Sequence, residues 1–126
     1  EMLTEIRVPL RPGTGSAYEK VKRRVGDWAI AASGASVRLE RGVIAEAGIA
    51  LTAVGGDVTS QRAEQSLAGV APTEEAFDAA ARLAAQDCTP QTDQRGSEEY
   101  KRHLAHELTL RALRGATARA LRLEEG

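Results

Sequence analysis

Hydrophobic residues alternate with small or polar ones in the first half of the chain and recur at helical spacing in the second half. Val37 and Leu39 extend an alternating run that begins near Trp28, and Ile49 and Leu51 lie in a second such run. A period of two is typical of strands with one buried face, and a period near 3.6 is typical of helices. The pattern predicts an α+β fold: a short helix, then a small antiparallel sheet of about three strands packed against a C-terminal three-helix bundle.

The sheet is expected between residues 27 and 52. Arg41-Gly42 fits a tight turn between two antiparallel strands, because glycine adopts the positive φ that short hairpins require. Residues 33–34 (Ser-Gly) indicate either a β-bulge or a close approach of another backbone. Residues 55–57 (Gly-Gly-Asp) end the sheet. They favour a turn over a phosphate-binding loop, because no G-x-x-G or G-K-S/T pattern follows.

Three helices are predicted for the second half. The first runs from Ser60 to Ala68 and stops at Gly69, and the second follows the N-cap residue Thr73. A polar loop then leads to the longest helix, capped by Ser97. The residues expected to face inward are Ala63, Leu67, Ala76, Phe77, Ala80, Leu83, Ala84, Tyr100, Leu104, Leu108, Ala112, Leu113 and Ala116. The opposite face of the longest helix carries Lys101, Arg102, Arg111 and Arg114.

The stretch from Ser16 to Trp28 is strongly basic, and we expect it to form the short helix. Ser16 and Glu19 have the spacing of a capping box. This stretch combines cations, a carboxylate and a large aromatic at a helix-to-strand junction. Such a combination suits a phosphate-bearing planar cofactor or an acidic partner. A basic run of this kind more commonly forms a solvated face. With 17 basic and 18 acidic side chains, the chain has no overall positive charge that would favour nucleic acid. The cations of this stretch are Lys20, Lys22, Arg23 and Arg24.

Residues that could carry catalysis are scarce. His103 and His106, with Glu107 beside them, have a spacing that can hold a metal, but a structural or solvent-exposed role is the simpler interpretation because no third ligand converges on them. Cys88 is the single cysteine, which excludes an internal disulfide, and we expect a buried thiol. Nucleophile-elbow, Walker and dinucleotide-binding motifs are all missing. No catalytic and no metal-binding residue is therefore predicted.

Three ordered segments carry a resemblance to a known family. They are residues 17–29 (AYEKVKRRVGDWA), 49–55 (IALTAVG) and 93–105 (DQRGSEEYKRHLA). Together they resemble the C-terminal domain of the FAD-binding medium subunit of molybdenum hydroxylases, the carbon monoxide dehydrogenase flavoprotein and xanthine dehydrogenase family. Residues 57–63 depart from the family pattern.

The resemblance also implies a domain organisation. Residues 1–12 would be the end strand of a truncated FAD-binding region, 13–117 the domain itself, and 118–126 a frayed tail. Deprived of its partners, the first segment is expected to be an edge strand, a swapped arm or a loosely held segment. The chain begins with Glu1, so we expect it to be a fragment of a longer protein.

The resemblance further implies a role in a multi-subunit oxidoreductase. Such an enzyme oxidises a small substrate at molybdenum and passes electrons through two [2Fe-2S] clusters to FAD. The molybdenum cofactor and the clusters would lie in a molybdenum large subunit and an iron–sulfur small subunit, assembled as a dimer of heterotrimers in the cytoplasm. Carbon monoxide, a purine, a nicotine-like heterocycle and an aldehyde all stay open as substrates.

By position, Lys20 and Trp28 match family residues near the flavin ring, with Tyr18 and Asp27 as companions. The lysine would stabilise negative charge on the reduced ring, and Trp28 would supply an apolar wall. Trp28 is also explained as a core or interface anchor. Two other function classes therefore remain: an interaction or dimerisation domain that does not touch flavin, and a basic regulator that binds nucleic acid.

Composition sets the remaining bounds. With one Phe, one Trp and two Tyr, the core must come from Ala, Leu, Val and Ile, so we expect a thin core that depends on neighbouring domains. No apolar run approaches the roughly 20 residues of a membrane span. A lone cysteine suits a reducing cytosol.

Overall fold

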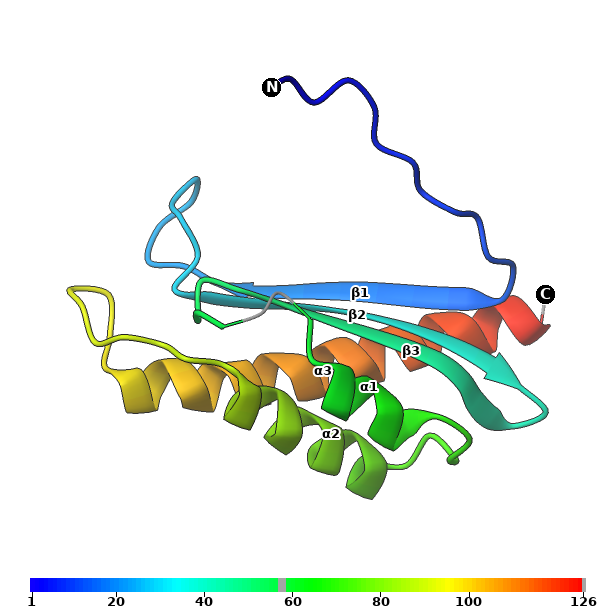
Figure 1. Ribbon diagram of the computed structural model, residues 1–126. Coiled ribbons are helices and arrows are strands. Elements are labelled where there is room, and N and C mark those ends of the chain that lie inside the picture. Colours follow the sequence, from blue (N-terminus) through cyan, green and yellow to red (C-terminus); the bar gives the residue numbers. More distant parts are fainter. Residues whose placement is uncertain (57–58, 126) are drawn as a thin grey trace.

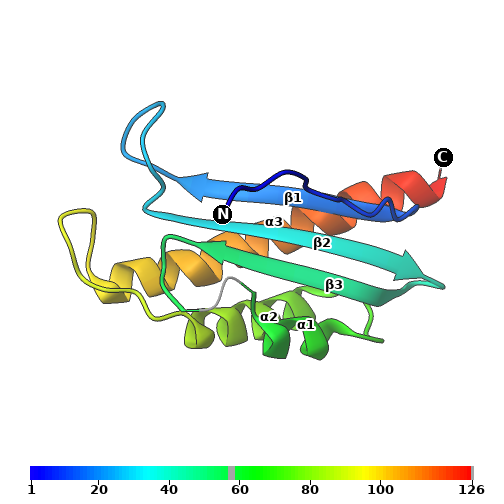
Figure 2. The same ribbon diagram turned by 45° about the horizontal axis from the view of Figure 1, so that its top comes forward.

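The computed structural model describes residues 1–56 and 59–125 and shows a two-layer α+β fold (Figure 1). Three antiparallel strands form a sheet in the order β1-β2-β3, and three helices cover one of its faces (Figures 1 and 2). The strands are β1 (Thr14–Val21), β2 (Ala31–Glu40) and β3 (Val43–Thr52). The helices are α1 (Gln61–Leu67), α2 (Glu74–Asp87) and α3 (Glu98–Glu125). The predicted α+β class, with a small antiparallel sheet and three C-terminal helices, is confirmed.

The helix predicted within residues 16–28 is wrong. Its first half belongs to β1, which pairs antiparallel with β2 in a register that sets Tyr18 opposite Gly34. Ser16 and Glu19, expected to form a capping box, lie on opposite faces of this strand because side chains alternate along it. The reason is tertiary: a ladder of backbone hydrogen bonds to β2 outweighs the modest helix propensity of Lys, Arg and Glu.

Small residues let α3 lie directly against β1. A Cβ atom on Gly15 would come 2.0 Å from the carbonyl oxygen of Ala116, and one on Gly115 would come 3.0 Å from the Cβ of Ala17. Figure 2 shows α3 running behind β1 and β2, with α1 and α2 on the β3 side. The sheet and α3 thus touch through their backbones at this end.

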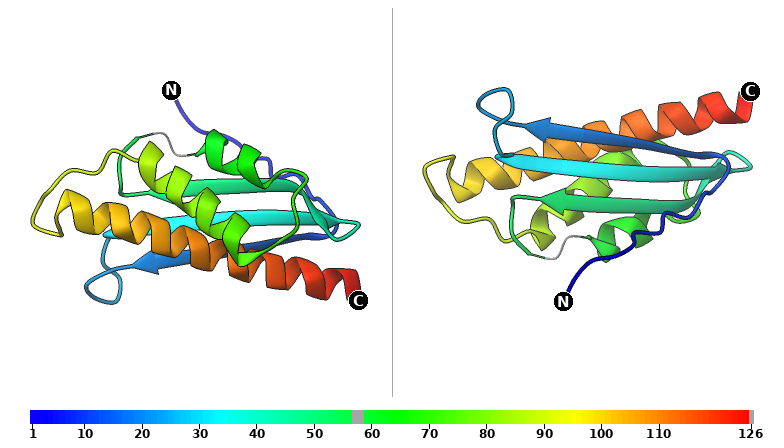
Figure 3. Two further views of the ribbon diagram at one scale, coloured as in Figure 1. Left: turned by 90° about the horizontal axis from the view of Figure 1, so that it is seen from below. Right: turned by 90° about the horizontal axis from the view of Figure 1, so that it is seen from above.

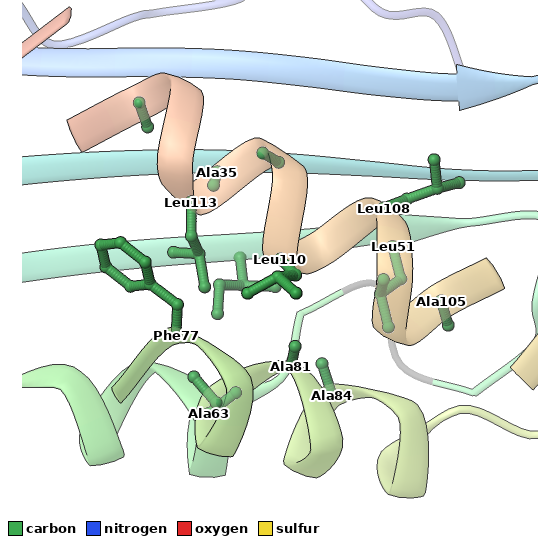
Figure 4. Close-up of a cluster of buried hydrophobic side chains, with 14 of the residues drawn as sticks. Ala35, Leu51, Ala63, Phe77, Ala81, Ala84, Ala105, Leu108, Leu110 and Leu113 are labelled. Atoms are coloured by element: carbon green, nitrogen blue, oxygen red, sulfur yellow. The ribbon is translucent and has the colours of Figure 1, made fainter. Parts of the chain in front are cut away.

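The core lies between the sheet and the helices (Figure 4). Phe77 of α2, Leu113 of α3 and Ile49 of β3 are all buried there. The hydroxyls of Ser33 and Thr109 share a hydrogen bond of 2.9 Å inside this layer, so two buried polar groups satisfy each other. Fully buried alanines fill most of the helix contacts, as the composition predicts: Ala63, Ala80, Ala81, Ala84, Ala112, Ala116 and Ala120.

Local capping and turn signals are confirmed. The Ser60, Thr73 and Ser97 side chains accept hydrogen bonds from the backbone N–H groups three residues ahead, at 3.4, 3.2 and 3.1 Å. Arg41 and Gly42 both have positive φ, as a tight hairpin turn requires. The β-bulge falls at Arg38/Leu39, not at residues 33–34. The caps and the turn depend on neighbours in sequence, which is why they can be predicted.

The glycine segment after β3 is a close backbone contact. Gly55 and Gly56 have positive φ, and a Cβ on either would meet the backbone of Thr89 or Asp87 within 2.9 Å. The two glycines therefore pack against the end of α2 and the residues that follow it, which supports the interpretation of this segment as a turn. Asp57, the third residue of the predicted turn, lies outside the described residues.

The predicted buried face of α3 is confirmed at Leu104, Leu108, Ala112, Leu113 and Ala116, but it is wrong in the first turn of the helix. Lys101 was assigned to the solvent face, but its side chain is only 6% exposed, whereas Tyr100, assigned to the core, is 43% exposed. In that first turn the side of the helix that faces the α2–α3 loop (residues 88–97) carries Lys101, which contacts Gln91 and Asp93, and not Tyr100. In α2, Ala76 and Leu83 are only partly buried.

Both chain ends differ from expectation. Residues 118–125 are not frayed, because α3 continues to Glu125 and Ala120 is fully buried. Residues 1–12 form no strand, which excludes the edge strand and leaves a swapped arm or a loosely held segment as predictions. They extend as an arm on the side of the sheet away from the helices (Figures 1 and 3). Five of the arm's apolar side chains are exposed: Met2, Leu3, Ile6, Val8 and Leu10.

Candidate functional site

Two loops far apart in sequence lie side by side at one end of the molecule (Figures 1 and 3). One is the connection between β1 and β2, residues 22–30, which we call the basic loop. The other, residues 88–97, joins α2 to α3 and is called the α2–α3 loop. The four residues named by the family resemblance all lie in the basic loop or at the adjoining end of β1.

Asp27 joins two of these residues. The Lys20 ammonium donates a hydrogen bond to the Asp27 carbonyl oxygen at 3.1 Å, and the Trp28 backbone N–H donates to Asp27 Oδ1 at 2.8 Å. The turn itself is closed by the Asp27 N–H bonding to the Arg24 carbonyl at 3.1 Å, with Gly26 at positive φ. The structure therefore brings Lys20, Asp27 and Trp28 together.

Tyr18 lies two positions before Lys20 on the same, open face of β1. Its ring lies beside Gly34 of β2, where an added Cβ would meet Tyr18 Cδ2 at 3.6 Å. Tyr18 is 62% exposed and Trp28 is 78% exposed, so neither aromatic belongs to the core of this chain. The interpretation of Trp28 as a core anchor is therefore wrong for the described residues, and the interpretation as a surface contact remains.

The open face of the sheet beside Tyr18 is lined mainly by small side chains. A shallow hollow there is formed by Gly34, Ser36, Gly48, Ala50, Thr59 and Glu64. Because these side chains are short, a flat group or another protein surface can approach the sheet backbone. In Figure 1 this face lies opposite the helix layer.

The α2–α3 loop is held by a buried lysine that was predicted to be in solvent. The Lys101 ammonium lies 2.9 Å from Asp93 Oδ2 and donates to the Gln91 carbonyl at 2.8 Å. Lys101 holds the pKa of the Asp93 carboxyl below its usual range. Two contacts then join this loop to the basic loop: Arg95 lies 3.9 Å from Asp27 Oδ1, and the Arg23 guanidinium donates to the Gln94 carbonyl.

The two histidines have different surroundings. His106 Nε2 lies 2.8 Å from Asp78 Oδ1 and so joins α3 to α2, and this bond lowers the pKa of Asp78. His103 lines a shallow surface hollow with Arg82 and Gln86. Over residues 1–56 and 59–125, no three His, Cys, Asp or Glu side chains are grouped to hold a metal ion.

Cys88 is a buried thiol, as predicted. Its sulfur donates to the Ala85 carbonyl at 3.0 Å, and burial raises the pKa of the thiol although Arg102 lies nearby. A raised pKa leaves little thiolate at neutral pH, so a nucleophilic role is not indicated. In the part of the chain that the structure describes, no helix is both long and apolar enough to traverse a bilayer.

Comparisons with known proteins agree with the resemblance. A family model described as the CO dehydrogenase flavoprotein C-terminal domain matches residues 16–116. Two relatives are named carbon monoxide dehydrogenase medium chain: that of Hydrogenophaga pseudoflava is 42% identical over 121 residues, and that of Afipia carboxidovorans 39% over 122. These alignments cover 94% and 95% of this chain, which spans 42% of the length of each relative.

A solved structure has the same fold. The carbon monoxide dehydrogenase from Hydrogenophaga pseudoflava that lacks the Mo-pyranopterin moiety of the molybdenum cofactor superposes with a TM-score of 0.84 and 42% identity. The match covers 87% of this chain and 39% of that one. Sequence, family model and three-dimensional fold thus agree, and the chain belongs to the family of CO dehydrogenase flavoprotein C-terminal domains.

Proposed function

We propose that this domain forms one wall of the flavin site in the FAD-carrying medium subunit of a molybdenum hydroxylase of the carbon monoxide dehydrogenase type. Support comes from family membership and from two relatives named as medium chains of that enzyme. In such an enzyme, FAD supplies the redox centre that accepts electrons from the rest of the complex and passes them to an external acceptor. The domain alone is not proposed to be catalytic.

The observation that carries the proposal is the exposed cluster around Asp27. Trp28 and Tyr18 offer aromatic surface that this chain leaves uncovered, and large exposed aromatics commonly mark a binding surface. Lys20 adds a cation beside them, fixed by its bond to the Asp27 carbonyl. Aromatic walls next to a held cation suit a planar group that becomes negative on reduction.

Each residue has a separate role in this proposal. Trp28 and Tyr18 pack against the flavin ring system and exclude water from it. Lys20 provides positive charge near the ring. Asp27 orients the other groups, because it accepts from Lys20 and from the Trp28 N–H at the same time. Most of the affinity for FAD is assigned to regions outside this chain.

The assembly is also part of the proposal. An iron–sulfur small subunit and a molybdenum large subunit would hold the [2Fe-2S] clusters and the molybdenum cofactor, in a cytoplasmic dimer of heterotrimers. The free, buried thiol of Cys88 is compatible with a reducing compartment. The names of the two relatives favour carbon monoxide over the other substrates considered.

The test is flavin affinity in the medium subunit that carries this domain. Trp28→Ala and Lys20→Ala are expected to weaken FAD binding roughly tenfold each, equivalent to about 1.4 kcal/mol, and Lys20→Ala is expected to lower the flavin midpoint potential. Val25→Ala and Lys22→Ala are matched controls from the same exposed loop. Unchanged FAD affinity and potential in both test variants would refute the proposal.

A second candidate is an interaction domain that does not contact flavin. It is favoured by the exposed apolar side chains of the N-terminal arm. The arm itself extends on the side of the sheet away from the helices (Figure 1). Under this alternative, Trp28→Ala would impair subunit assembly, measured by analytical ultracentrifugation, and leave flavin content per assembled complex unchanged.

A further inference from the structure

We propose that Arg95 is a positioning residue for the basic loop: it holds Asp27, and through Asp27 it sets the orientation of Lys20 and Trp28. The Lys101–Asp93 ion pair in turn anchors the loop from which Arg95 extends. This inference rests on the proposed flavin function and assigns to the α2–α3 loop a role in shaping that site.

The anchor is the first step. Lys101 lies near the start of α3, and its ammonium is nearly inaccessible to water, so it requires compensating partners. It has two, Asp93 Oδ2 at 2.9 Å and the Gln91 carbonyl at 2.8 Å. Both partners belong to the α2–α3 loop. The loop is therefore fixed to a long helix that packs along the sheet.

The second step is the turn that carries Arg95. The Asp93 and Gly96 backbones exchange hydrogen bonds of 3.0 and 3.2 Å, and the Arg95 N–H donates to Asp93 Oδ1 at 2.8 Å. Asp93 thus uses one carboxylate oxygen for Lys101 and the other for the backbone of Arg95. The same ion pair that anchors the loop also fixes the main chain at Arg95.

The third step is the contact between the loops. The Arg95 guanidinium lies 3.9 Å from Asp27 Oδ1, the oxygen that also accepts from the Trp28 N–H. Both side chains are about three-quarters buried, so solvent screens their attraction only partly. Arg23 makes the reciprocal contact, donating to the Gln94 carbonyl. Each loop therefore extends one arginine to the other.

A positioning role for Arg95 follows because most of the basic loop has little apolar burial to hold it in place. Val25 is almost fully exposed and Trp28 largely so, and among residues 22–30 the hydrophobic core takes in Ile30, at the end of the loop. The conformation of the part before Ile30 therefore depends on its few polar contacts. Loss of the Arg95 contact should leave global unfolding unchanged and raise local opening of residues 22–30.

Amide hydrogen exchange on the chain tests this. Arg95→Ala is expected to speed exchange in residues 22–30 about threefold to fivefold, the change expected on losing one partly exposed ion pair, with no change in melting temperature. Arg95→Lys should restore part of the protection. Arg82→Ala, which removes an arginine paired with Asp78 at 2.8 Å on α2, is the control and should not affect the loop.

Fluorescence and flavin binding complete the test. Quenching of Trp28 emission by acrylamide should increase in Arg95→Ala and return toward the parent value in Arg95→Lys. Exchange and quenching identical to the parent in Arg95→Ala would overturn the inference, even if Lys20→Ala weakens FAD binding and so supports the proposed function. A different outcome is faster exchange in Arg95→Ala while FAD affinity stays unchanged in Arg95→Ala, Lys20→Ala and Trp28→Ala. That outcome would support the positioning contact and refute the flavin role.

Discussion

Gly15 of β1 and Ala116 of α3 are in backbone contact, so close that any side chain at position 15 would overlap the Ala116 carbonyl oxygen. The contact sets the distance between the sheet and its longest helix. It also explains why β1, despite its charged residues, can lie flat against α3: the residues facing the helix near this point are Gly15 and Ala17.

Replacing Gly15 by alanine should therefore destabilise the fold. The new Cβ would meet backbone atoms, which cannot rotate away, so we expect a loss of about 1–3 kcal/mol or more in the free energy of unfolding. Gly34→Ala is the matched control on the neighbouring strand, where the nearest atom would be 3.6 Å away. Equal stability of the two variants in urea titrations would show that α3 shifts freely over β1.

Phe77 is expected to be the most sensitive aromatic position. It is the single phenylalanine and lies buried among α2, α3 and the sheet, so Phe77→Ala should cost about 3–5 kcal/mol. Phe77→Leu, which keeps most of the volume, should cost less than about 1.5 kcal/mol. Denaturant midpoints measure both. A small loss in Phe77→Ala would mean that the alanine-rich core closes over the cavity.

The Lys101–Asp93 pair makes the α2–α3 loop sensitive to acid. The pKa of Asp93 is lowered in the fold, first by its bond to Lys101 and then by the Arg95 N–H. A carboxylate with a lowered pKa stabilises the fold above its unfolded pKa, about 3.9, and this contribution is lost as the pH falls through the lower folded value. Asp93→Asn should thus be less stable than the parent at pH 7, and the difference should shrink as the pH falls below the unfolded pKa and vanish below the folded one. A difference independent of pH would contradict the pairing.

Cys88 should be inert in the folded protein. Burial raises the pKa of its thiol and blocks access, so Ellman's reagent at pH 8 should react only as fast as the protein unfolds. In guanidinium chloride the reaction should be complete within the mixing time. Rapid labelling of native protein would mean that the end of α2 opens locally.

The hairpin of β2 and β3 and the three helices could be predicted because their signals are local. Arg41-Gly42 marks the turn, and Ser60, Thr73 and Ser97 cap helices within three residues of themselves. β1 could not be recognised in this way. Its charged residues suit a helix, and its strand conformation comes from pairing with β2, to which its own sequence does not point.

The candidate site also has residues that the sequence identifies and residues that only the tertiary contacts identify. Lys20 and Trp28 were identified by their positions in a family motif, and the structure shows that Asp27 contacts both. Arg95 and Lys101 were missed as members of the site. Lys101 resembles an ordinary surface lysine until its partner Asp93 is known, and the Arg95 contact joins two loops that are distant in sequence. Only the arrangement of β1, β2 and α3 brings these loops together.

The alternation along β1 restricts how the length of this segment can change during evolution. With Gly15 held against the helix, one added residue between Gly15 and Tyr18 would turn Tyr18 and Lys20 toward α3. Two added residues would return Tyr18 and Lys20 to the open face. Insertions and deletions within this strand should therefore occur in even numbers among relatives that keep the aromatic and the lysine, whereas odd changes should be confined to the loops at its ends.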